Sequence, residues 1–202
     1  MTSHQDSDSI EPRLVLASGS PRRRDLLMSV GFDPKIVPPE VEELKAGSLP
    51  PRELCLHNAR LKSVNVSKYF RHDYVVASDT VVAMDRTVFG KPESICEAAA
   101  NLRRLSGRVH EVMSAVVIQR GEEVIEFVEV SCVKFRKLGE AVIQEYLSRV
   151  PVLDKAGGYA IQDHGDWLVE EIEGDYENIV GLPLAKVLVS LEKMGFGPPE
   201  RR

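Results

Sequence analysis

The order of apolar and polar positions along the chain predicts strands interleaved with helices. Short apolar runs are typical of buried strands, and apolar residues spaced three or four apart are typical of helices with one buried face. We expect strands at residues 13–18, 32–37, 74–77, 81–84, 87–89, 109–119, 123–130, 132–136 and 167–173. We expect helices at residues 21–30, 93–105, 140–149 and 183–194, and one that starts near residue 51. Because strands and helices alternate, the predicted fold class is α/β with a mixed sheet.

The helix that starts near residue 51 is expected to bury one side. Its apolar residues Leu54, Ala59, Leu61 and Val64 are predicted to form the buried stripe. The acidic, proline-rich stretch before it, residues 38–51, predicts a loop. The fold therefore places an acidic loop directly before an amphipathic helix.

Composition places the chain among globular proteins. It has 202 residues, of which 43% are hydrophobic and 28% are charged, which is enough for one domain or one domain with two lobes. A formal net charge of −5 argues against a nucleic acid as partner. No apolar stretch reaches the length of about 20 residues that a membrane helix needs, so no membrane partner is expected.

The chain ends and the cysteines predict a cytoplasmic protein. Residues 1–12 are polar and lack the apolar core of a signal peptide. We therefore expect a flexible N-terminal tail there, a single domain over residues 13–196 and a C-terminal tail over residues 197–202. The cysteines are odd in number and show no Cys-x-x-Cys spacing, so free thiols in a reducing compartment are expected.

The start of the first helix is a candidate phosphate-binding site. Ser20 is suited to cap this helix, and Arg22–Arg24 follow in its first turn. Each exposed cation there opposes the helix dipole by about 0.3–1 kcal/mol. An arriving anion would reverse that penalty, because backbone N–H groups and guanidinium forks would both hold it. The alternative is that the arginines pair at the surface with carboxylates such as Asp25, and at least one is expected to do so.

Asp79 is the best single candidate for a general base or a metal ligand. It interrupts an apolar run, residues 74–82, in which a carboxylate is costly to bury without a cation, a metal or hydrogen-bond donors. The alternative is a carboxylate that closes a strand end through an Asx turn. Glu43, beside Glu42 in the acidic loop, is either a second carboxylate of the site or part of a solvated charge run.

Two lysines and a glutamine are weaker candidates. Lys91 is held between Gly90 and Pro92, and Lys62 lies beside the apolar stripe of its helix. Gln162 follows two adjacent glycines and offers one donor and one acceptor, which match the imide edge of uracil or thymine. The alternatives are solvated lysines and a tight turn with a capping glutamine.

Eight short motifs follow one another between residues 14 and 196. They read S-G-S-P-R-R, E-E, A-R-L-K, S-D-T-V-V, G-K-P, L-S-G, D-K-A-G-G-Y-A-I-Q and N-I-V-G-L-P. In identity and order they resemble the Maf family of nucleotide pyrophosphatases. The segment D-K-A-G-G-Y-A-I-Q resembles the branch that cleaves dTTP and UTP rather than the branch that acts on 7-methyl-GTP. Ala77-Ser78 replace the usual Gly-Ala before Asp-Thr, and residues 163–166 are more polar than the family pattern.

The resemblance implies a single elongated domain, in which a mixed twisted sheet is flanked by helices and a deep cleft lies between two lobes. It implies a cytoplasmic, often homodimeric enzyme that hydrolyses dTTP or UTP to the monophosphate and pyrophosphate. For such a reaction we expect Mg²⁺ or Mn²⁺ as cofactor, because a divalent cation would neutralise the charge that develops on the leaving pyrophosphate. Carried over to this sequence, the family's site residues are Asp79 as general base, Arg22, Thr80 and Gln162 for specificity, and Ser18, Glu43, Lys62 and Lys91 in the cleft.

Two other functions stay open from the sequence. One is a house-cleaning enzyme that hydrolyses modified or other non-canonical nucleotides in the same pocket. The other is a nucleotide-binding regulator of cell division with little turnover. Asp79 among basic residues favours turnover, because binding alone gains nothing from a carboxylate near phosphates. Whether Asp79 serves as base or as metal ligand is left open by the sequence.

Overall fold

The structure is a computed structural model that describes residues 12–198. Residues 1–11 and 199–202, which hold most of the two predicted tails, lie outside the described residues. Within the described range, no helix combines the length and the apolar character needed to cross a lipid bilayer.

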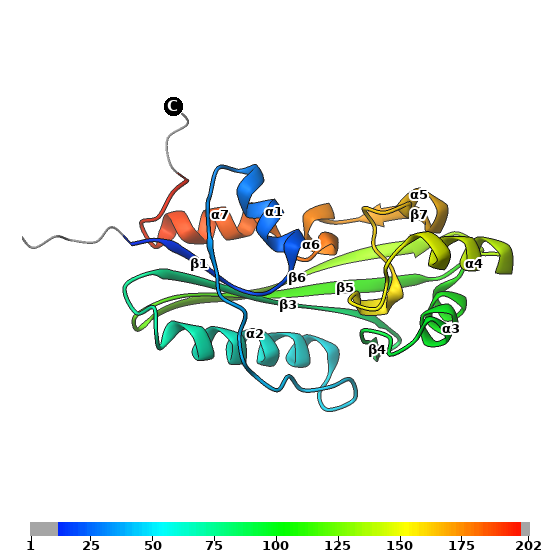
Figure 1. The fold of residues 1–202 in the computed structure, drawn as a ribbon, viewed down its shortest axis with the longest axis horizontal. Coiled ribbons are helices and arrows are strands. Elements are labelled where there is room, and N and C mark those ends of the chain that lie inside the picture. The colour runs from blue at the N-terminus through cyan, green and yellow to red at the C-terminus, as the bar shows by residue number, and fades with distance from the viewer. Residues whose placement is uncertain (1–11, 199–202) are drawn as a thin grey trace, which may run out of the picture.

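Seven strands form one mixed sheet, which confirms the predicted α/β class (Figure 1). They are β1 (Leu14–Ala17), β2 (Lys35–Ile36), β3 (Tyr74–Met84), β4 (Thr87–Phe89), β5 (Val109–Arg120), β6 (Glu123–Phe135) and β7 (Val169–Glu173). The order across the sheet is β2-β1-β3-β5-β6-β7, and β4 pairs with β3. β1 pairs in parallel with β2 and β3, and the other pairs are antiparallel.

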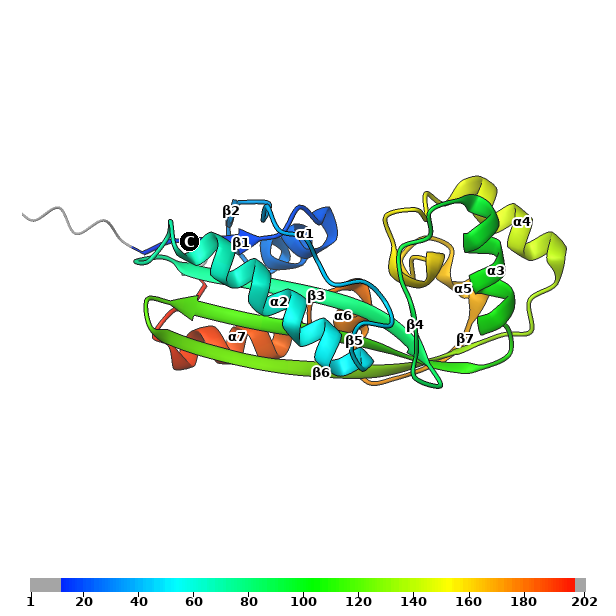
Figure 2. The same ribbon diagram turned by 90° about the horizontal axis from the view of Figure 1, so that it is seen from below.

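Helices cover both faces and one end of this sheet. They are α1 (Pro21–Ser29), α2 (Pro51–Ser67), α3 (Ile95–Leu105), α4 (Glu140–Arg149), α5 (Gly165–Leu168), α6 (Tyr176–Val180) and α7 (Leu184–Lys193), with a short 3-10 helix, η1 (Ala156–Gly158). Figure 1 shows α2 against one face of the long strands and α1, α6 and α7 against the other. Figure 2 shows α3 and α4 together at the end of the molecule remote from β1, so the molecule is elongated.

Separate apolar clusters attach these helices to the sheet. Leu191 of α7 packs in a cluster with Ile118 of β5, on the face that α1 also covers. Leu54 of α2 packs in another cluster with Ala115 of β5. A third cluster gathers α3 and α4 around the buried Tyr146. The sheet thus provides one rigid platform for helices that come from distant parts of the sequence.

The predicted hairpin is confirmed, but two predicted strand breaks are wrong. Asp85 and Arg86 both adopt left-handed backbone angles, φ 50° and 66°, as a tight two-residue turn requires. β3 runs without interruption through Asp79, and β6 runs through Ser131. Both polar residues stay in the strand because partners compensate them: the Ser131 hydroxyl, for instance, donates to the Asp175 carbonyl at 2.9 Å.

Two other strand predictions need correction, and one helix was not predicted. Only Lys35–Ile36 of the strand expected at residues 32–37 pairs with β1, because Phe32 turns inward to pack in the α7 cluster. Trp167 lies in α5 rather than in β7. Helix α6 was not expected, and the Asp175 side chain caps it by accepting hydrogen bonds from two backbone N–H groups.

The buried face of α2 differs from the predicted stripe. Leu54 and Ala59 are buried as expected, but Val64 is 62% exposed. The buried face carries Asn58 and Lys62 instead, with exposed fractions of 3% and 6%. The apolar pattern failed here because Lys62 meets Asp79 of β3, and Asn58 meets the backbone of Leu44 in the loop before α2.

The packing of α2 can be tested by truncating one side chain on each face. Leu54→Ala is expected to lower the free energy of unfolding by about 2–5 kcal/mol, because Leu54 is 2% exposed and its removal leaves a cavity. Val64→Ala on the same helix serves as the control and is expected to change it by less than about 0.5 kcal/mol. Urea unfolding of the two variants measures the difference, and equal losses would contradict the observed orientation of α2.

Candidate active site

A pocket of about 860 Å³ lies where the first turn of α1, the loop before α2, the centre of β3 and residues 154–162 meet. This volume lies in the range of about 300–1,000 Å³ that is usual for small-molecule sites. The pocket is lined by every site residue that the sequence singled out, namely Ser18, Arg22, Glu43, Lys62, Asp79, Thr80, Lys91 and Gln162.

Lys62 joins two carboxylates in the floor of the pocket. Its ammonium nitrogen lies 2.6 Å from Oδ1 of Asp79 and 2.8 Å from Oε2 of Glu43. Lys62 and Asp79 have side chains that are only 8% and 11% exposed, so their charges are poorly solvated. The cation that the burial of Asp79 demanded is therefore Lys62, which approaches from the buried face of α2.

Asn58 holds the acidic loop in position against α2. Its side-chain amide donates to the Leu44 carbonyl at 3.1 Å and accepts from the Leu44 N–H at 2.9 Å. Both bonds fix the backbone of the residue next to Glu43. The loop therefore presents Glu43 to Lys62 through a specific two-point contact, although the segment has no regular secondary structure.

The two carboxylates respond differently to the shared ammonium group. Burial raises the pKa of Asp79, the charge of Glu43 adds to the rise, and Lys62 and Arg23 oppose it. Burial also raises the pKa of Glu43, but charge and hydrogen bonding from Lys62 outweigh burial, so the pKa of Glu43 is lowered. Asp79 is therefore the stronger base of the pair.

A buried thiol supports the strand beneath Asp79. The Cys55 Sγ donates toward the Asp79 carbonyl oxygen at 3.1 Å and accepts from the Ala115 N–H at 3.2 Å. Burial, followed by the charge of Asp79, raises the pKa of Cys55 to about 12. This cysteine is therefore a neutral structural thiol, not a nucleophile.

The three consecutive arginines have three different environments. Arg22 lies at the pocket wall, and its Nη1 donates to Asp154 at 3.3 Å. Arg23 is buried, with an exposed fraction of 9%. Arg24 pairs at the surface with Asp25 at 2.7 Å, which confirms that at least one of the three is a plain surface residue.

Arg23 is fixed by three neutral acceptors. Its Nε donates to the Gly181 carbonyl at 2.8 Å, its Nη1 to Ser18 Oγ at 3.1 Å and its Nη2 to Thr80 Oγ1 at 3.0 Å. Thr80 Oγ1 also lies 2.8 Å from Ser114 Oγ. Because the Ser114 hydroxyl donates to the Asn178 carbonyl, the Thr80 hydroxyl donates to Ser114 and accepts from Arg23.

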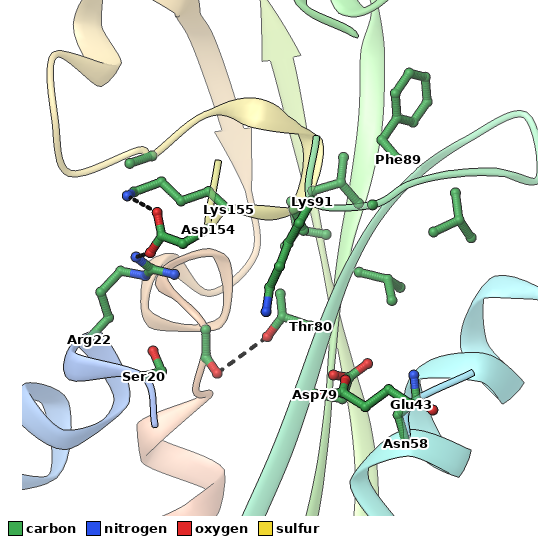
Figure 3. A pocket seen from close by; sticks show the side chains of 18 of the residues that line it. Ser20, Arg22, Glu43, Asn58, Asp79, Thr80, Phe89, Lys91, Asp154 and Lys155 are labelled. Atoms are coloured by element: carbon green, nitrogen blue, oxygen red, sulfur yellow. Dashed lines mark hydrogen bonds and ion pairs between the residues drawn. The ribbon is translucent and has the colours of Figure 1, made fainter. Parts of the chain in front are cut away.

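Lys91 and the pair Asp154–Lys155 complete the charged wall. Figure 3 shows Arg22 and Asp154 on one side of the pocket, Asp79 on the other, and Lys91 extending into the space between them. The positive charge of Lys91 contributes to the lowered pKa of Glu43, which agrees with this position. Lys155 donates to Asp154 at 2.7 Å.

Gln162 lies in the same lining but in a more exposed position than Asp79. It follows η1, in which Gly157 and Gly158 have φ angles of 76° and 75°. A Cβ atom on Gly158 would come within 3.3 Å of the Ala98 backbone, so a glycine is needed for η1 to pack against α3. This packing brings the segment that carries Gln162 to the pocket.

Sequence reasoning did not separate Arg23 from its neighbours in the candidate phosphate-binding turn, and it assigned no role in the site to Cys55 or Gly181. For Arg23 a signal was present, because it precedes the buried Leu27 by four residues and therefore shares its helix face. For Gly181 and its neighbours no local signal existed, since their partners lie more than one hundred residues away in the chain.

The donor atoms of the pocket suit a cation that also binds the substrate. Within residues 12–198 no group of three or more His, Cys, Asp or Glu side chains could hold a metal alone. Asp79 and Glu43 are a pair of hard oxygen donors, and Mg²⁺ usually binds one or two carboxylates together with phosphate oxygens. The residues present therefore fit Mg²⁺ or Mn²⁺ shared with a polyphosphate, not a metal site made by protein alone.

Comparison with known proteins identifies the family. The family model described as "Maf-like protein" matches residues 13–194. The chain is 45% identical to the dTTP/UTP pyrophosphatase of Pyrococcus abyssi over 94% of this chain and 100% of that protein. It is 42% identical to that of Akkermansia muciniphila over 92% of this chain and 98% of that protein. It is 43% identical to that of Thermus thermophilus over 93% of this chain and 98% of that protein. The chain therefore belongs to the Maf family.

Proposed function

We propose that this protein is a nucleoside triphosphate pyrophosphatase that hydrolyses dTTP and UTP to the monophosphate and pyrophosphate. The observation that carries the proposal is the Glu43–Lys62–Asp79 arrangement, a base with a raised pKa in a pocket that also holds Arg22 and Lys91. The relatives named dTTP/UTP pyrophosphatase match nearly the whole chain and support the same substrate class.

Asp79 is the proposed proton acceptor. A water molecule attacks the α-phosphorus, its proton passes to a carboxylate oxygen of Asp79, and the bond from the α-phosphorus to the oxygen bridging to the β-phosphate breaks. Lys62 keeps the carboxylate oriented and ionised before the attack, since its ammonium lies 2.6 Å away. Arg22 and Lys91 hold the phosphates, which supplies the positioning and charge stabilisation that phosphoryl transfer needs.

Asp79 and Glu43 are the residues that would hold the divalent cation implied by the family. Bound there, the cation would neutralise negative charge on the leaving pyrophosphate. A protein that only bound nucleotide would gain nothing from a carboxylate with a raised pKa beside the phosphates. The arrangement therefore favours turnover over a purely regulatory role.

Gln162 is the proposed reader of the pyrimidine edge, with Thr80 as the second specificity residue. A side-chain amide can pair with one carbonyl and the imide N–H of uracil or thymine. Held in the orientation that pairs with an imide, the amide would meet the reversed order of donor and acceptor on cytosine and adenine, which would be disfavoured, and guanine would be disfavoured by its larger ring system. The same recognition would admit thymine- and uracil-like modified bases.

The shape of the pocket, the assembly and the location of the protein are also proposed. We propose that the pocket is a deep cleft between two lobes of a single domain over residues 13–196, since α1 forms one wall and the segment packed on α3 forms another. The family resemblance supports a homodimer. The three cysteines are free, which supports a cytoplasmic location.

A nucleotide panel tests the proposed activity. Pyrophosphate release is measured with dTTP, UTP, CTP, ATP, GTP, 5-methyl-UTP and pseudo-UTP, with Mg²⁺ and with a chelator. The values of kcat/KM for dTTP and UTP are expected to exceed those for ATP and GTP by at least about tenfold. Chelation is expected to abolish most of the release. Equal rates for all nucleotides would contradict base recognition, and no release from any of them would refute the proposed function.

Asp79→Asn tests the assignment of the base. The kcat is expected to fall by about 10²–10⁴, the scale of lost general-base catalysis. Circular dichroism is expected to show the native fold, because Glu43 remains 2.8 Å from the Lys62 ammonium and keeps it paired. Asp25→Asn at the surface is the control for both measurements. Near-native kcat in Asp79→Asn would show that another group accepts the proton.

Glu43→Gln tests the coupling between the carboxylates through the pH profile. The charge of Glu43 raises the pKa of Asp79, so its removal should lower that pKa. The acidic limb of kcat/KM, which reports the ionisation of Asp79 in the free enzyme, is then expected to move to lower pH. Glu42→Gln, which changes the exposed neighbouring carboxylate, should leave the limb in place. A limb that moves to higher pH in Glu43→Gln would contradict the coupling.

A further inference from the structure

Arg23 is a buried cation without a carboxylate partner among the described residues. Its exposed fraction is 9%, and within residues 12–198 it forms no ion pair. Its three hydrogen bonds go to a carbonyl and two hydroxyl groups, which are neutral. A buried charge usually requires an opposite charge in contact with it, so the site is incomplete without an anion.

The guanidinium group has donors left for such an anion. Of its five N–H groups, one on Nε, one on Nη1 and one on Nη2 are used by Gly181, Ser18 and Thr80. One N–H on each terminal nitrogen remains, and Arg23 lines the pocket. Burial lowers the pKa of Arg23 while the nearby charge of Asp79 opposes this effect, so the group is a cation close to the proposed base.

The three acceptors hold the Arg23 guanidinium in one orientation and are themselves held in place; together they are called the mount. Gly181 has a φ angle of 132°, and a Cβ atom there would lie 3.7 Å from both Arg23 Nε and Thr80 Oγ1. Its carbonyl also accepts from Ser78 Oγ at 3.3 Å. Thr80 is held in turn by Ser114. The mount fixes the orientation of the guanidinium without cancelling its charge, whereas Arg22 is already paired with the carboxylate of Asp154.

We infer that Arg23 is the principal phosphate-binding guanidinium of this pocket, and that Thr80 and Ser18 act through it as positioning residues. The inference rests on the proposed function, because the anion is then a phosphate of the nucleotide next to Asp79. It adds to Thr80 a role in holding Arg23, beside the specificity role proposed above. Gln162 is left as the residue that contacts the pyrimidine edge.

Inorganic pyrophosphate is the probe that isolates this role, because it has phosphates but no base. Its binding to the full-length protein is measured by calorimetry in Mg²⁺ buffer, and kcat and KM are measured with UTP. Arg23→Gln is expected to weaken pyrophosphate binding by about tenfold or more and to lower kcat by about 10²–10³, the scale of a lost charge-stabilising donor. Arg23→Lys keeps the charge but not the fork and should lie between this variant and the native protein.

Arg24→Gln is the matched control on the same helix. Arg24 pairs only with Asp25 at the surface, so both measurements should change by less than about threefold. Native-like pyrophosphate binding and kcat in Arg23→Gln would overturn the inference. If circular dichroism shows that Arg23→Gln does not fold, Arg23→Lys and the Thr80 variants provide the test in its place, and native-like values in them overturn the inference equally.

Two variants of Thr80 distinguish a role in positioning Arg23 from a role in recognising the base. Thr80→Val removes the acceptor while keeping the shape, and it should weaken pyrophosphate binding and lower kcat by about tenfold, as expected for a lost hydrogen bond to a charged group. Thr80→Ser restores the hydroxyl and should restore both values. If Thr80→Val instead changes the ratio of UTP to GTP hydrolysis and leaves pyrophosphate binding intact, Thr80 reads the base and the inference is overturned.

Failure of the inference and failure of the proposed function give different results. A native protein that binds pyrophosphate but releases none from any nucleotide would refute the proposed function, while the loss of binding in Arg23→Gln would still support the role of Arg23. A native protein that binds no pyrophosphate at all would overturn the inference whatever its activity. If the native protein and Arg23→Gln release pyrophosphate from UTP at equal rates, the proposed function is supported and the proposed role of Arg23 is refuted.

Discussion

The buried ion pair between Asp79 and Lys62 is the interaction on which the pocket depends. A carboxylate in the middle of β3, opposite Ala115 of β5, is tolerable only because an ammonium group reaches it from α2. That helix is held in place by apolar residues such as Leu54, on the same face of the helix as Lys62. The packing that stabilises the fold and the contact that orients the proposed base are therefore the same piece of structure.

Much of the fold and the centre of the site could be predicted because their causes are local. Alternating strands and helices follow from periodicities within single segments, and they predicted the mixed sheet. Asp79 could be identified because a carboxylate in an apolar run has a cost that is visible from its neighbours alone. The short motifs around Ser18 and Gln162 extended this to residues that line one pocket. Burial cost and local geometry thus pointed to residues that the structure brings together in one pocket.

The parts that could not be predicted depend on contacts between distant segments. The pattern placed Val64 inside and gave no reason to bury Lys62, because the partner of Lys62 lies on a strand and not on the helix. Arg23 and not Arg22 is buried because its Nε donates to the carbonyl of Gly181, which lies 158 residues later in the chain. A hydrogen bond across such a separation leaves no periodic trace in the sequence.

The contact between Arg22 and Asp154 has a consequence for which anions can enter. Because this guanidinium already has a carboxylate partner, an incoming anion competes with Asp154 for its positive charge. A singly charged ion such as chloride gains little from the exchange, since it replaces one negative charge with another. A polyphosphate can displace Asp154 and still use its other oxygens on Lys91. An exposed ion pair of this kind contributes no more than about 1 kcal/mol. It therefore gives a weak preference for multiply charged anions and does not block their entry.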